Sequence, residues 1–292
     1  MTSIFDVLVK ATQIIKKNSI PTPRLDCEVI LSYLLGVDRS YLIINSNEKL
    51  NEVTINKFNK LILRRLNGEP VAYIVENQEF MGLNYYVNKN VLIPRPDTEI
   101  LVEYVIKYCN NMQKEHINIL DIGTGSGAIG LSIAKYIHKS KVTLSDISNN
   151  ALKIAKINAN NIGVSKQVNY CQSDCLDTLV KGKYDIIISN PPYIPTNEIS
   201  YLQKEVKEYE PQIALDGGDD GLLYYRKIIK QSKEYLCKNA LVIFEIGYNQ
   251  SIEVMKLLNN AGYKNIQKIK DLGLNDRVVR ANAGTLENNK RV

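Results

Sequence analysis

The sequence INILDIGTGSGAIG, residues 117–130, is the stretch that decides the fold. Its first six residues, 117–122, are mostly apolar and have the length of a buried strand, and a helical stretch begins near Ala128. Glycines occupy every second position of the turn between them, where they allow positive φ angles and let a ligand approach the main chain. The spacing is one residue tighter than the G-x-G-x-x-G pattern of dinucleotide-binding turns, which argues against a dehydrogenase. The stretch predicts a strand, a turn and a helix, with a ligand on the turn; the alternative is a tight turn without a ligand.

Short apolar segments and helical segments go on alternating after this unit. Strands are expected at 117–122, 141–144, 168–171, 184–189, 240–246, 266–269 and 278–279. Such alternation is typical of a doubly wound α/β sheet, here Rossmann-like and seven-stranded.

The residues before this sheet follow a helical period instead. Residues 1–75 predict a small all-helical domain, with one helix that follows Pro23 and stops at Gly36 and another that ends by Gly68. A β-hairpin linker is expected over 76–94, the main α/β domain over 95–284, and a flexible tail over 285–292.

The composition is that of an ordinary globular protein, with 45% hydrophobic and 23% charged residues. A net charge of +6 permits contact with nucleic acid without requiring it. The five cysteines are odd in number and scattered, and the two histidines follow no metal-ligand spacing, so we expect reduced thiols and no metal. No apolar run approaches the roughly 18 residues that would span a bilayer, which predicts a cytoplasmic protein with no membrane contact.

Two acids follow predicted strands at the edge where a doubly wound sheet binds its ligand. Asp146 lies 25 residues beyond Asp121, close to the offset at which an acid binds ribose hydroxyls; the alternative is an N-cap for the helix near Ser148. Asp174 would accept a proton from an adenine amino group, or it is a solvated turn residue.

The most specific signal is Asn190-Pro191-Pro192-Tyr193, directly after the strand 184–189. Two consecutive prolines fix two φ angles and remove two N–H donors, so the turn presents a rigid carbonyl. Asn190 adds a side-chain carbonyl, and Tyr193 offers a flat aromatic face.

Two acceptors and a stacking face suit an NH₂ group on a planar carbon. Each acceptor takes one N–H, and the hydrogen bonds strengthen as positive charge develops on the nitrogen. The tetrapeptide therefore predicts methylation of an amide or exocyclic amine; the alternative is a loop stiffened by proline.

The chain resembles the release factor glutamine N5-methyltransferases over nearly its whole length. Besides the glycine turn and Asn190 to Tyr193, the matching segments are 23–26 (PRLD), 68–70 (GEP), 80–83 (FMGL), 93–99 (IPRPDTE), 210–211 (EP), 214–218 (ALDGG), 220–222 (DGL) and 245–247 (EIG).

The resemblance implies a fold, a methyl donor, a partner and a set of site residues. S-adenosylmethionine, converted to S-adenosylhomocysteine, would be held by Gly123, Thr124, Gly125, Ser126, Gly127, Asp146, Asp174, Cys175 and Asn190. Asn190, Pro191, Pro192 and Tyr193 would bind the substrate glutamine, with Asn190, Pro191 and Tyr193 catalytic. The partner would be a class I peptide-chain release factor, methylated in its Gly-Gly-Gln motif in support of translation termination, and the helical domain would recognise it.

Three other functions compete with this one. A ribosomal-protein glutamine methyltransferase usually differs just after Arg95, although Asp97 or Thr98 in that segment would equally serve as a helix cap. A nucleic-acid amino methyltransferase fits the tetrapeptide, but residues 196–220 carry seven acids against two lysines, the wrong sign for duplex phosphates. A non-enzymatic module that senses S-adenosylmethionine would leave the tetrapeptide unexplained.

Overall fold

A computed structural model describes residues 2–18, 20–179 and 184–284, and the expected tail at 285–292 lies outside the described residues. The chain divides into two compact units. The first comprises residues 1–77 together with 203–209, and the second comprises residues 78–202 and 210–292.

The first unit is a helical bundle around its own apolar core. Its elements are β1 Thr2–Ser3, α1 Ile4–Lys17, α2 Pro23–Leu35, α3 Arg39–Ile44, β2 Lys49–Leu50, α4 Glu52–Leu66, α5 Val71–Ile74 and α9 Lys204–Tyr209. Ile4, Leu8, Ile30 and Phe58 are among the residues buried where α1, α2 and α4 meet. Helix α2 ends at Gly36 in the left-handed conformation, as the sequence predicts. The antiparallel pair β1–β2 is an addition that the helical period did not indicate.

A buried ion-pair network holds the later segment 203–209 on these helices. Arg65 on α4 donates to Asp26 on α2 at 2.7 Å and to Glu205 on α9 at 2.6 Å. Removing one partner of such a buried group would leave an uncompensated charge, which is strongly destabilising. The segment 23–26 therefore has a structural role through Asp26.

The second unit is built on a seven-stranded sheet in the order β10-β11-β9-β8-β5-β6-β7. The strands are β5 Ile117–Ile122, β6 Ser140–Asp146, β7 Val168–Gln172, β8 Tyr184–Ser189, β9 Leu236–Glu245, β10 Lys264–Lys270 and β11 Asp276–Asn282. The neighbours from β7 to β9 are parallel, whereas β11 runs antiparallel to β9 and to β10. This confirms the doubly wound fold. From β5 the sheet continues through β6 and β7 in one direction and through β8 and β9 in the other, so the strand order reverses between β5 and β8. A doubly wound sheet binds its ligand at such a point.

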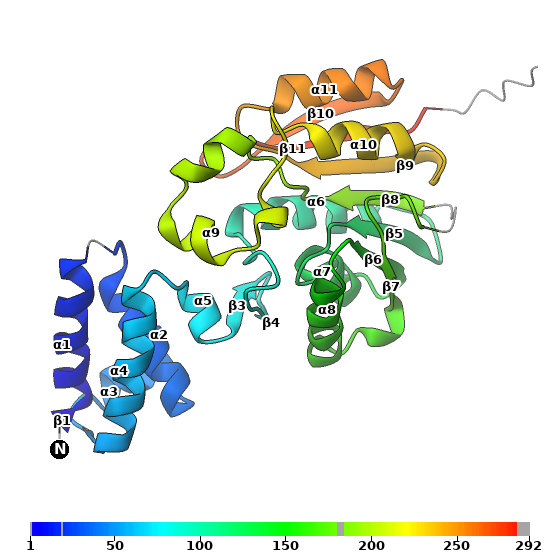
Figure 1. The fold of residues 1–292 in the computed structure, drawn as a ribbon. Coiled ribbons are helices and arrows are strands. Elements are labelled where there is room, and N and C mark those ends of the chain that lie inside the picture. The colour runs from blue at the N-terminus through cyan, green and yellow to red at the C-terminus, as the bar shows by residue number, and fades with distance from the viewer. Residues whose placement is uncertain (1, 19, 180–183, 285–292) are drawn as a thin grey trace, which may run out of the picture. The chain divides into compact units, whose positions relative to one another are not determined.

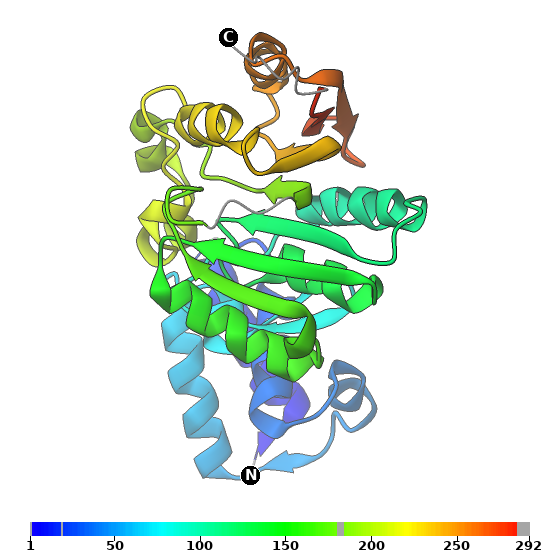
Figure 2. The same ribbon diagram turned by 90° about the vertical axis from the view of Figure 1, so that its right-hand side faces the viewer.

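Helices cover both faces of this sheet. The helices are α6 Glu99–Asn110, α7 Ala128–Tyr136, α8 Asn149–Ile162, α10 Leu223–Ser232 and α11 Ser251–Asn260, with 3-10 turns η1 Pro96–Thr98, η2 Ser165–Gln167, η3 Thr196–Tyr201 and η4 Gln212–Ala214. Helices α6, α7 and α8 pack side by side as one layer, and α10 packs with α11. Figures 1 and 2 show α10 and α11 beside β9, β10 and β11, and α7 and α8 beside β5, β6 and β7. Leu120, Ile187, Val242 and Phe244 contribute to the core under α10 and α11. The residues that alternate with these along the same strands face the layer of α6, α7 and α8.

A short hairpin, β3 Asn77–Phe80 with β4 Leu83–Tyr86, precedes the sheet. Asn158 on α8 connects it to the glycine turn, because its amide donates to the carbonyls of Tyr86 (3.0 Å) and Ser126 (2.8 Å). The hairpin expected in the linker is therefore present, but it ends at Tyr86 and an irregular segment follows to Arg95.

Candidate active site

The glycine turn between β5 and α7 has the shape that its sequence predicts. Gly123, Gly125 and Gly127 have φ angles of 69°, 56° and 84°, a region that strongly favours glycine. A Cβ built on Gly123 or Gly125 would meet no atom within 4 Å, so open space lies over these two residues. Thr124 and Ser126 are buried, and the Thr124 hydroxyl donates to Asp121 at 2.6 Å. Two glycines thus face outward while the other residues of the turn hold its shape.

Asp146, at the end of β6, holds the turn from the neighbouring strand. Its carboxylate accepts the backbone N–H of Gly125 and that of Ser148, both at 2.8 Å. Burial raises the pKa of Asp146, while these backbone hydrogen bonds lower it. Ser148 is the N-cap of α8 and accepts the Ala151 N–H, so the alternative role of Asp146 as the helix cap is wrong.

Asp174 and Cys175 follow β7. Lys227 on α10 forms an ion pair with Asp174 at 2.7 Å and another with Asp177 at 2.9 Å. Cys175 is buried, with a positive φ angle of 53°, and burial raises the pKa of its thiol to about 12. The thiol is therefore protonated at neutral pH.

The tetrapeptide Asn190-Pro191-Pro192-Tyr193 lies at the carboxyl end of β8, one strand from the glycine turn. The Ser189 hydroxyl donates to the Ile122 carbonyl at 2.8 Å and joins the ends of β8 and β5. No described residue hydrogen-bonds the Pro191 carbonyl, which leaves it available as an acceptor.

A glycine-rich loop, residues 214–222, packs against the far side of the tetrapeptide. Ile194 accepts the Gly217 N–H at 2.8 Å and donates its own N–H to the Leu215 carbonyl at 3.1 Å. A Cβ on Gly217 would lie 2.8 Å from the Tyr193 Cα, so only glycine fits there. Gln250, just before α11, donates to the Tyr193 carbonyl at 2.9 Å and to the Gly221 carbonyl at 3.3 Å. The loop and Gln250 together fix the backbone of the tetrapeptide.

The Asn190 side chain contacts the start of α6. Its Nδ2 lies 3.4 Å from the buried Thr98 Oγ1, a long hydrogen bond. Asp97 forms an ion pair with Arg277 on β11 at 3.1 Å. Thr98, one of the two residues considered for the N-cap of α6, occupies that position, but its side chain makes no capping hydrogen bond there.

A pocket with a cavity volume of about 110 Å³ lies where the glycine turn and the tetrapeptide meet. It is lined mostly by apolar groups. The lining includes eight of the predicted site residues: Gly123, Gly125, Asp146, Asp174, Cys175, Asn190, Pro191 and Pro192. It also includes Asn90, Val91 and Leu92 from the segment after the hairpin, and Pro211, Ile213, Ala214 and Tyr224.

Four predicted site residues lie outside the lining of this pocket. Thr124, Ser126 and Gly127 belong to the inner side of the turn. Tyr193 lies instead near the charges of Glu245, Arg277 and Arg95, and burial raises the pKa of its phenol to about 12. Tyr193 is thus half-buried beside the pocket and is not part of its lining.

Comparison with known proteins identifies the family. Residues 6–75 match the family model of the PrmC N-terminal domain, and residues 98–207 match that of the methyltransferase small domain. A release factor glutamine methyltransferase of Clostridium acetobutylicum is 43% identical over 97% of this chain and 99% of the relative. Another, from Clostridium botulinum, is 40% identical over 94% of this chain and 98% of the relative. The chain belongs to the release factor glutamine methyltransferase family. Among solved structures, the hMettl16 catalytic domain in complex with MAT2A 3′UTR hairpin 6 has a TM-score of 0.58 at 15% identity, over 88% of this chain and 93% of that one, which shows the fold alone.

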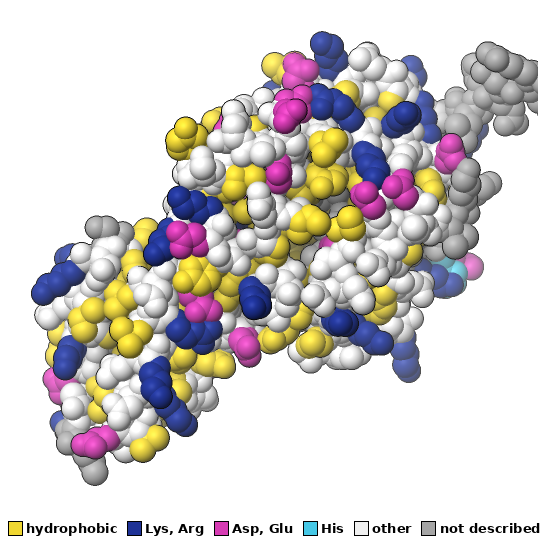
Figure 3. Space-filling view, viewed as in Figure 1, with side chains coloured by type: hydrophobic (Ala, Val, Ile, Leu, Met, Phe, Trp, Pro, Cys, Tyr) yellow, Lys and Arg dark blue, Asp and Glu magenta, His cyan; other side chains and the backbone are white. Residues whose placement is uncertain are grey.

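For a methyltransferase of this family, the acids of residues 196–220 are of interest because they would face a partner if free. Several are instead engaged within the chain. Glu205 pairs with Arg65, Glu210 with Arg95, and Asp220 with Arg226. Figure 3 shows acidic and basic side chains intermixed on one face of the molecule. The net charge of this stretch therefore overstates the acidity of its surface.

The described residues contain no helix both long and apolar enough to cross a membrane, and no cluster of three or more potential metal-ligating side chains. Sequence reasoning missed that Thr98, Gln250 and Glu245 lie next to the tetrapeptide. Thr98 and Glu245 lie inside segments that carry the family resemblance, which was the available signal.

Proposed function

We propose that this protein transfers a methyl group from S-adenosylmethionine to the side-chain amide nitrogen of the glutamine in the Gly-Gly-Gln motif of class I peptide-chain release factors. The observation that carries the proposal is the 43% identity with a release factor glutamine methyltransferase along almost the whole of both chains. The proposal places the enzyme in the cytoplasm, where translation terminates.

The pocket between the glycine turn and the tetrapeptide fits the methyl donor. Open space over Gly123 and Gly125 lets a ligand approach the main chain, and Asp146 is the acid at the second strand end that would accept ribose hydroxyls. Asp174 and Cys175 would contact the adenine, and Thr124, Ser126 and Gly127 would act by holding the turn in shape. When bound, S-adenosylmethionine supplies an electrophilic methyl group on a positively charged sulfur.

Asn190 and Pro191 would hold the substrate amide. The Asn190 Oδ1 and the Pro191 carbonyl each accept one N–H of the glutamine NH₂, while Pro192 keeps the backbone rigid and Tyr193 covers the side chain. Both hydrogen bonds strengthen as the nitrogen becomes more positive, so they stabilise the transition state more than the ground state. The methylated amide then loses its proton to water, so no general base is needed.

The helical unit would recognise the body of the release factor. Its match to the PrmC N-terminal domain supports this assignment, because the unit has a core of its own and none of its described residues lines the pocket. We infer that it raises the affinity for the whole factor while the second unit carries the chemistry.

Mass spectrometry of the acceptor tests the proposed function. The protein is incubated with methyl-labelled S-adenosylmethionine and, in separate reactions, with a release factor, ribosomal proteins and DNA. A mass gain of 14 Da plus the mass increment of the isotopic label is expected on the Gly-Gly-Gln glutamine, since one methyl group replaces one hydrogen. Label only on ribosomal protein or only on DNA would assign a different acceptor, and no transfer to any of them would favour a non-enzymatic module.

A further inference from the structure

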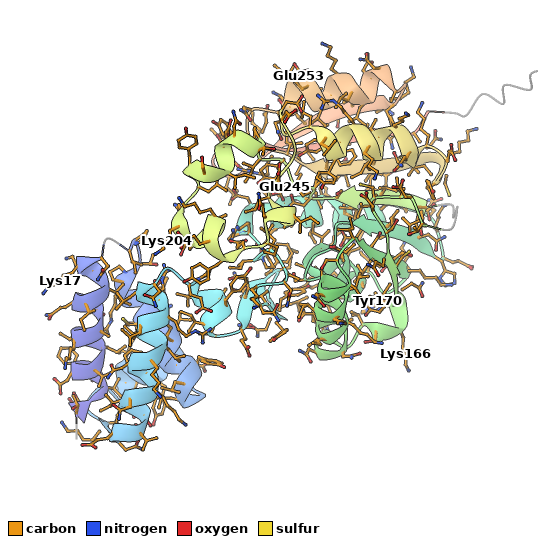
Figure 4. The ribbon with its side chains drawn as sticks, viewed as in Figure 1. Lys17, Lys166, Tyr170, Lys204, Glu245 and Glu253 are labelled. Carbon is orange, nitrogen blue, oxygen red and sulfur yellow. The ribbon has the colours of Figure 1, made fainter. Side chains whose placement is uncertain are left out.

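Glu245 lies beside Asn190 at the carboxyl edge of the sheet. The parallel register of β8 and β9 pairs Ser189 with Phe244, so the residues that follow, Asn190 and Glu245, are also neighbours. Phe244 belongs to the core under α10 and α11, and alternation along a strand turns Glu245 to the opposite face, where α6 begins. Figure 4 labels Glu245 at this end of β9.

Glu245 is an unusual residue to bury. The residue is only 2% exposed, and its Oε2 atom has no hydrogen-bond partner among the described residues. The nearby Arg277 forms its ion pairs with Asp97 and Asp271 instead. A buried carboxylate that is not fully partnered costs stability, and such a group in a native structure calls for a functional explanation.

We infer that Glu245 is a positioning residue that orients the side chain of Asn190, an inference that rests on the proposed function. An ionised carboxylate only accepts hydrogen bonds, so it attracts the NH₂ end of the Asn190 amide and repels the carbonyl end. Thr98 Oγ1, 3.4 Å from Nδ2, supports the same orientation. With its NH₂ directed at Glu245 and Thr98, Asn190 has only Oδ1 left for the substrate.

The opposite orientation of Asn190 would be unproductive. It would place an NH₂ group against the NH₂ of the substrate glutamine, so two donors would face each other and no charge would be stabilised on the nitrogen. A positioning group is therefore needed to keep the two ends of an asparagine side chain, which have almost the same shape, from exchanging.

Protonation of Glu245 would reverse this preference. Burial raises the pKa of Glu245 to about 7, while hydrogen bonds from Thr98 and Asn190 and the charge of Arg277 lower it and the charge of Asp97 raises it. Tyr193 also faces this carboxyl and, with its pKa raised to about 12, stays neutral. A protonated Glu245 would donate to Asn190 Oδ1 and compete with the substrate. The kcat of the enzyme should therefore fall as the pH drops through about 7, because Glu245 no longer orients Asn190 once it is protonated.

The test compares full-length Glu245→Leu, Glu245→Gln, Asn190→Ala and the double variant Glu245→Leu/Asn190→Ala with the wild type. Partners that orient a functional side chain are typically worth about 10- to 100-fold, so Glu245→Leu should lower kcat by that factor while the Kd for S-adenosylmethionine stays within about twofold. Glu245→Gln keeps an acceptor oxygen, so its rate should lie between those of wild type and Glu245→Leu, without the fall near pH 7. In the Asn190→Ala background, Glu245→Leu should add less than about a further twofold loss, because it acts through Asn190.

Asp185→Asn provides a matched control. Asp185 is a buried acid, 3% exposed, on the neighbouring strand β8, at the opposite edge of the sheet from Glu245, where it pairs with Lys114 at 2.5 Å. This variant should lose stability and keep the wild-type pH profile of kcat.

A second measurement needs no substrate and covers the case in which Glu245→Leu does not fold. The side-chain ¹⁵N amide resonances of Asn190, assigned with Asn190→Ala, should titrate with a midpoint near pH 7 in the wild type and not in Glu245→Gln. If the wild-type protein does not methylate release factor, the proposed function is rejected. The titration of the Asn190 resonances then decides the role of Glu245 by itself. Fully multiplicative losses in the double variant, or Asn190 resonances that do not titrate near pH 7, would overturn the inference.

Discussion

Replacing Gly221 by alanine should lower the kcat of the enzyme, although Gly221 does not line the pocket. Gly221 has a φ angle of 72°, and a Cβ there would lie 2.4 Å from the Tyr193 carbonyl oxygen and 2.7 Å from Gln250 Nε2. A carbon normally stays about 3.3 Å or more from a carbonyl oxygen, so the two backbones must separate by roughly 0.9 Å. Neither neighbour is free to yield, because Gln250 holds the Tyr193 carbonyl at 2.9 Å and the Gly247 N–H at 3.0 Å.

The displacement falls on the tetrapeptide that would hold the substrate amide. A misplacement of about 1 Å at a catalytic group can lower turnover about 100-fold, and the left-handed backbone adds about 1–2 kcal/mol of strain in the folded state. We therefore expect kcat to fall about 100-fold and the free energy of unfolding to fall by about 2–3 kcal/mol, which a single domain of ordinary stability would survive. The Kd for S-adenosylmethionine should change little, since the glycine turn and Asp146 are not displaced.

The assay pairs steady-state methylation of release factor with urea denaturation and titration calorimetry of cofactor binding. Gly163→Ala is the matched control: Gly163 ends α8 with a φ angle of 82°, and a Cβ there would meet no atom within 4 Å. It should carry the same backbone strain of about 1–2 kcal/mol without a loss of turnover. If Gly221→Ala keeps the turnover of Gly163→Ala, the loop does not position the tetrapeptide and the reasoning fails.

Three further outcomes are expected. Asn190→Ala should lower kcat by on the order of 100-fold while the Kd for S-adenosylmethionine stays within a small factor, since it removes one transition-state acceptor; an unchanged rate would reject its role. Deleting residues 1–75 should raise KM for whole release factor far more than for a short Gly-Gly-Gln peptide, and an equal rise for both would mean that the catalytic unit itself was damaged. Burial raises the pKa of Asp121 to about 6, so the folded protein binds the proton of this carboxyl more tightly than the unfolded chain does. The contribution of Asp121 to the free energy of unfolding should therefore grow, by up to about 3 kcal/mol, as the pH falls from about 6 to about 4. Asp121→Asn should remove that part of the slope in urea melts at several pH values, and equal slopes would contradict the assignment.

Two central strands, β5 and β8, were predictable to the residue. Both are mostly apolar runs that end at a glycine turn and at Asn190-Pro191, and their observed bounds are the expected ones. β9 begins at Leu236, four residues before the expected start. Its first part breaks the apolar period, since Lys238 and Asn239 are exposed, Asn239 has a φ angle of 59°, and the register with β8 shifts there.

Contacts between distant segments were out of reach of the sequence pattern. The helical period of residues 1–75 contains nothing that indicates α9, which joins this unit through the pairing of Arg65 with a glutamate 140 residues further along. The same holds for β1 and β2, which are two residues each and too short to show a period.

The residues of the pocket and the residues around it also differ in how far the sequence predicts them. The glycine turn, Asp146 and the tetrapeptide were predictable because each carries its chemistry within a few consecutive residues at the end of a strand. Glu245 has no such local signature: it is one acid at the end of an apolar strand, which by itself suggests a turn residue. Its neighbour depends on the register of β8 against β9, which pairs Ser189 with Phe244 and thereby brings Glu245 to Asn190. A slip of one residue in that register would turn the carboxyl to the other face and into the core under α10 and α11. The orientation that we propose for Asn190 is therefore a property of strand pairing, and a motif search that treats Asn190-Pro191-Pro192-Tyr193 as self-sufficient omits the carboxyl group beside its asparagine.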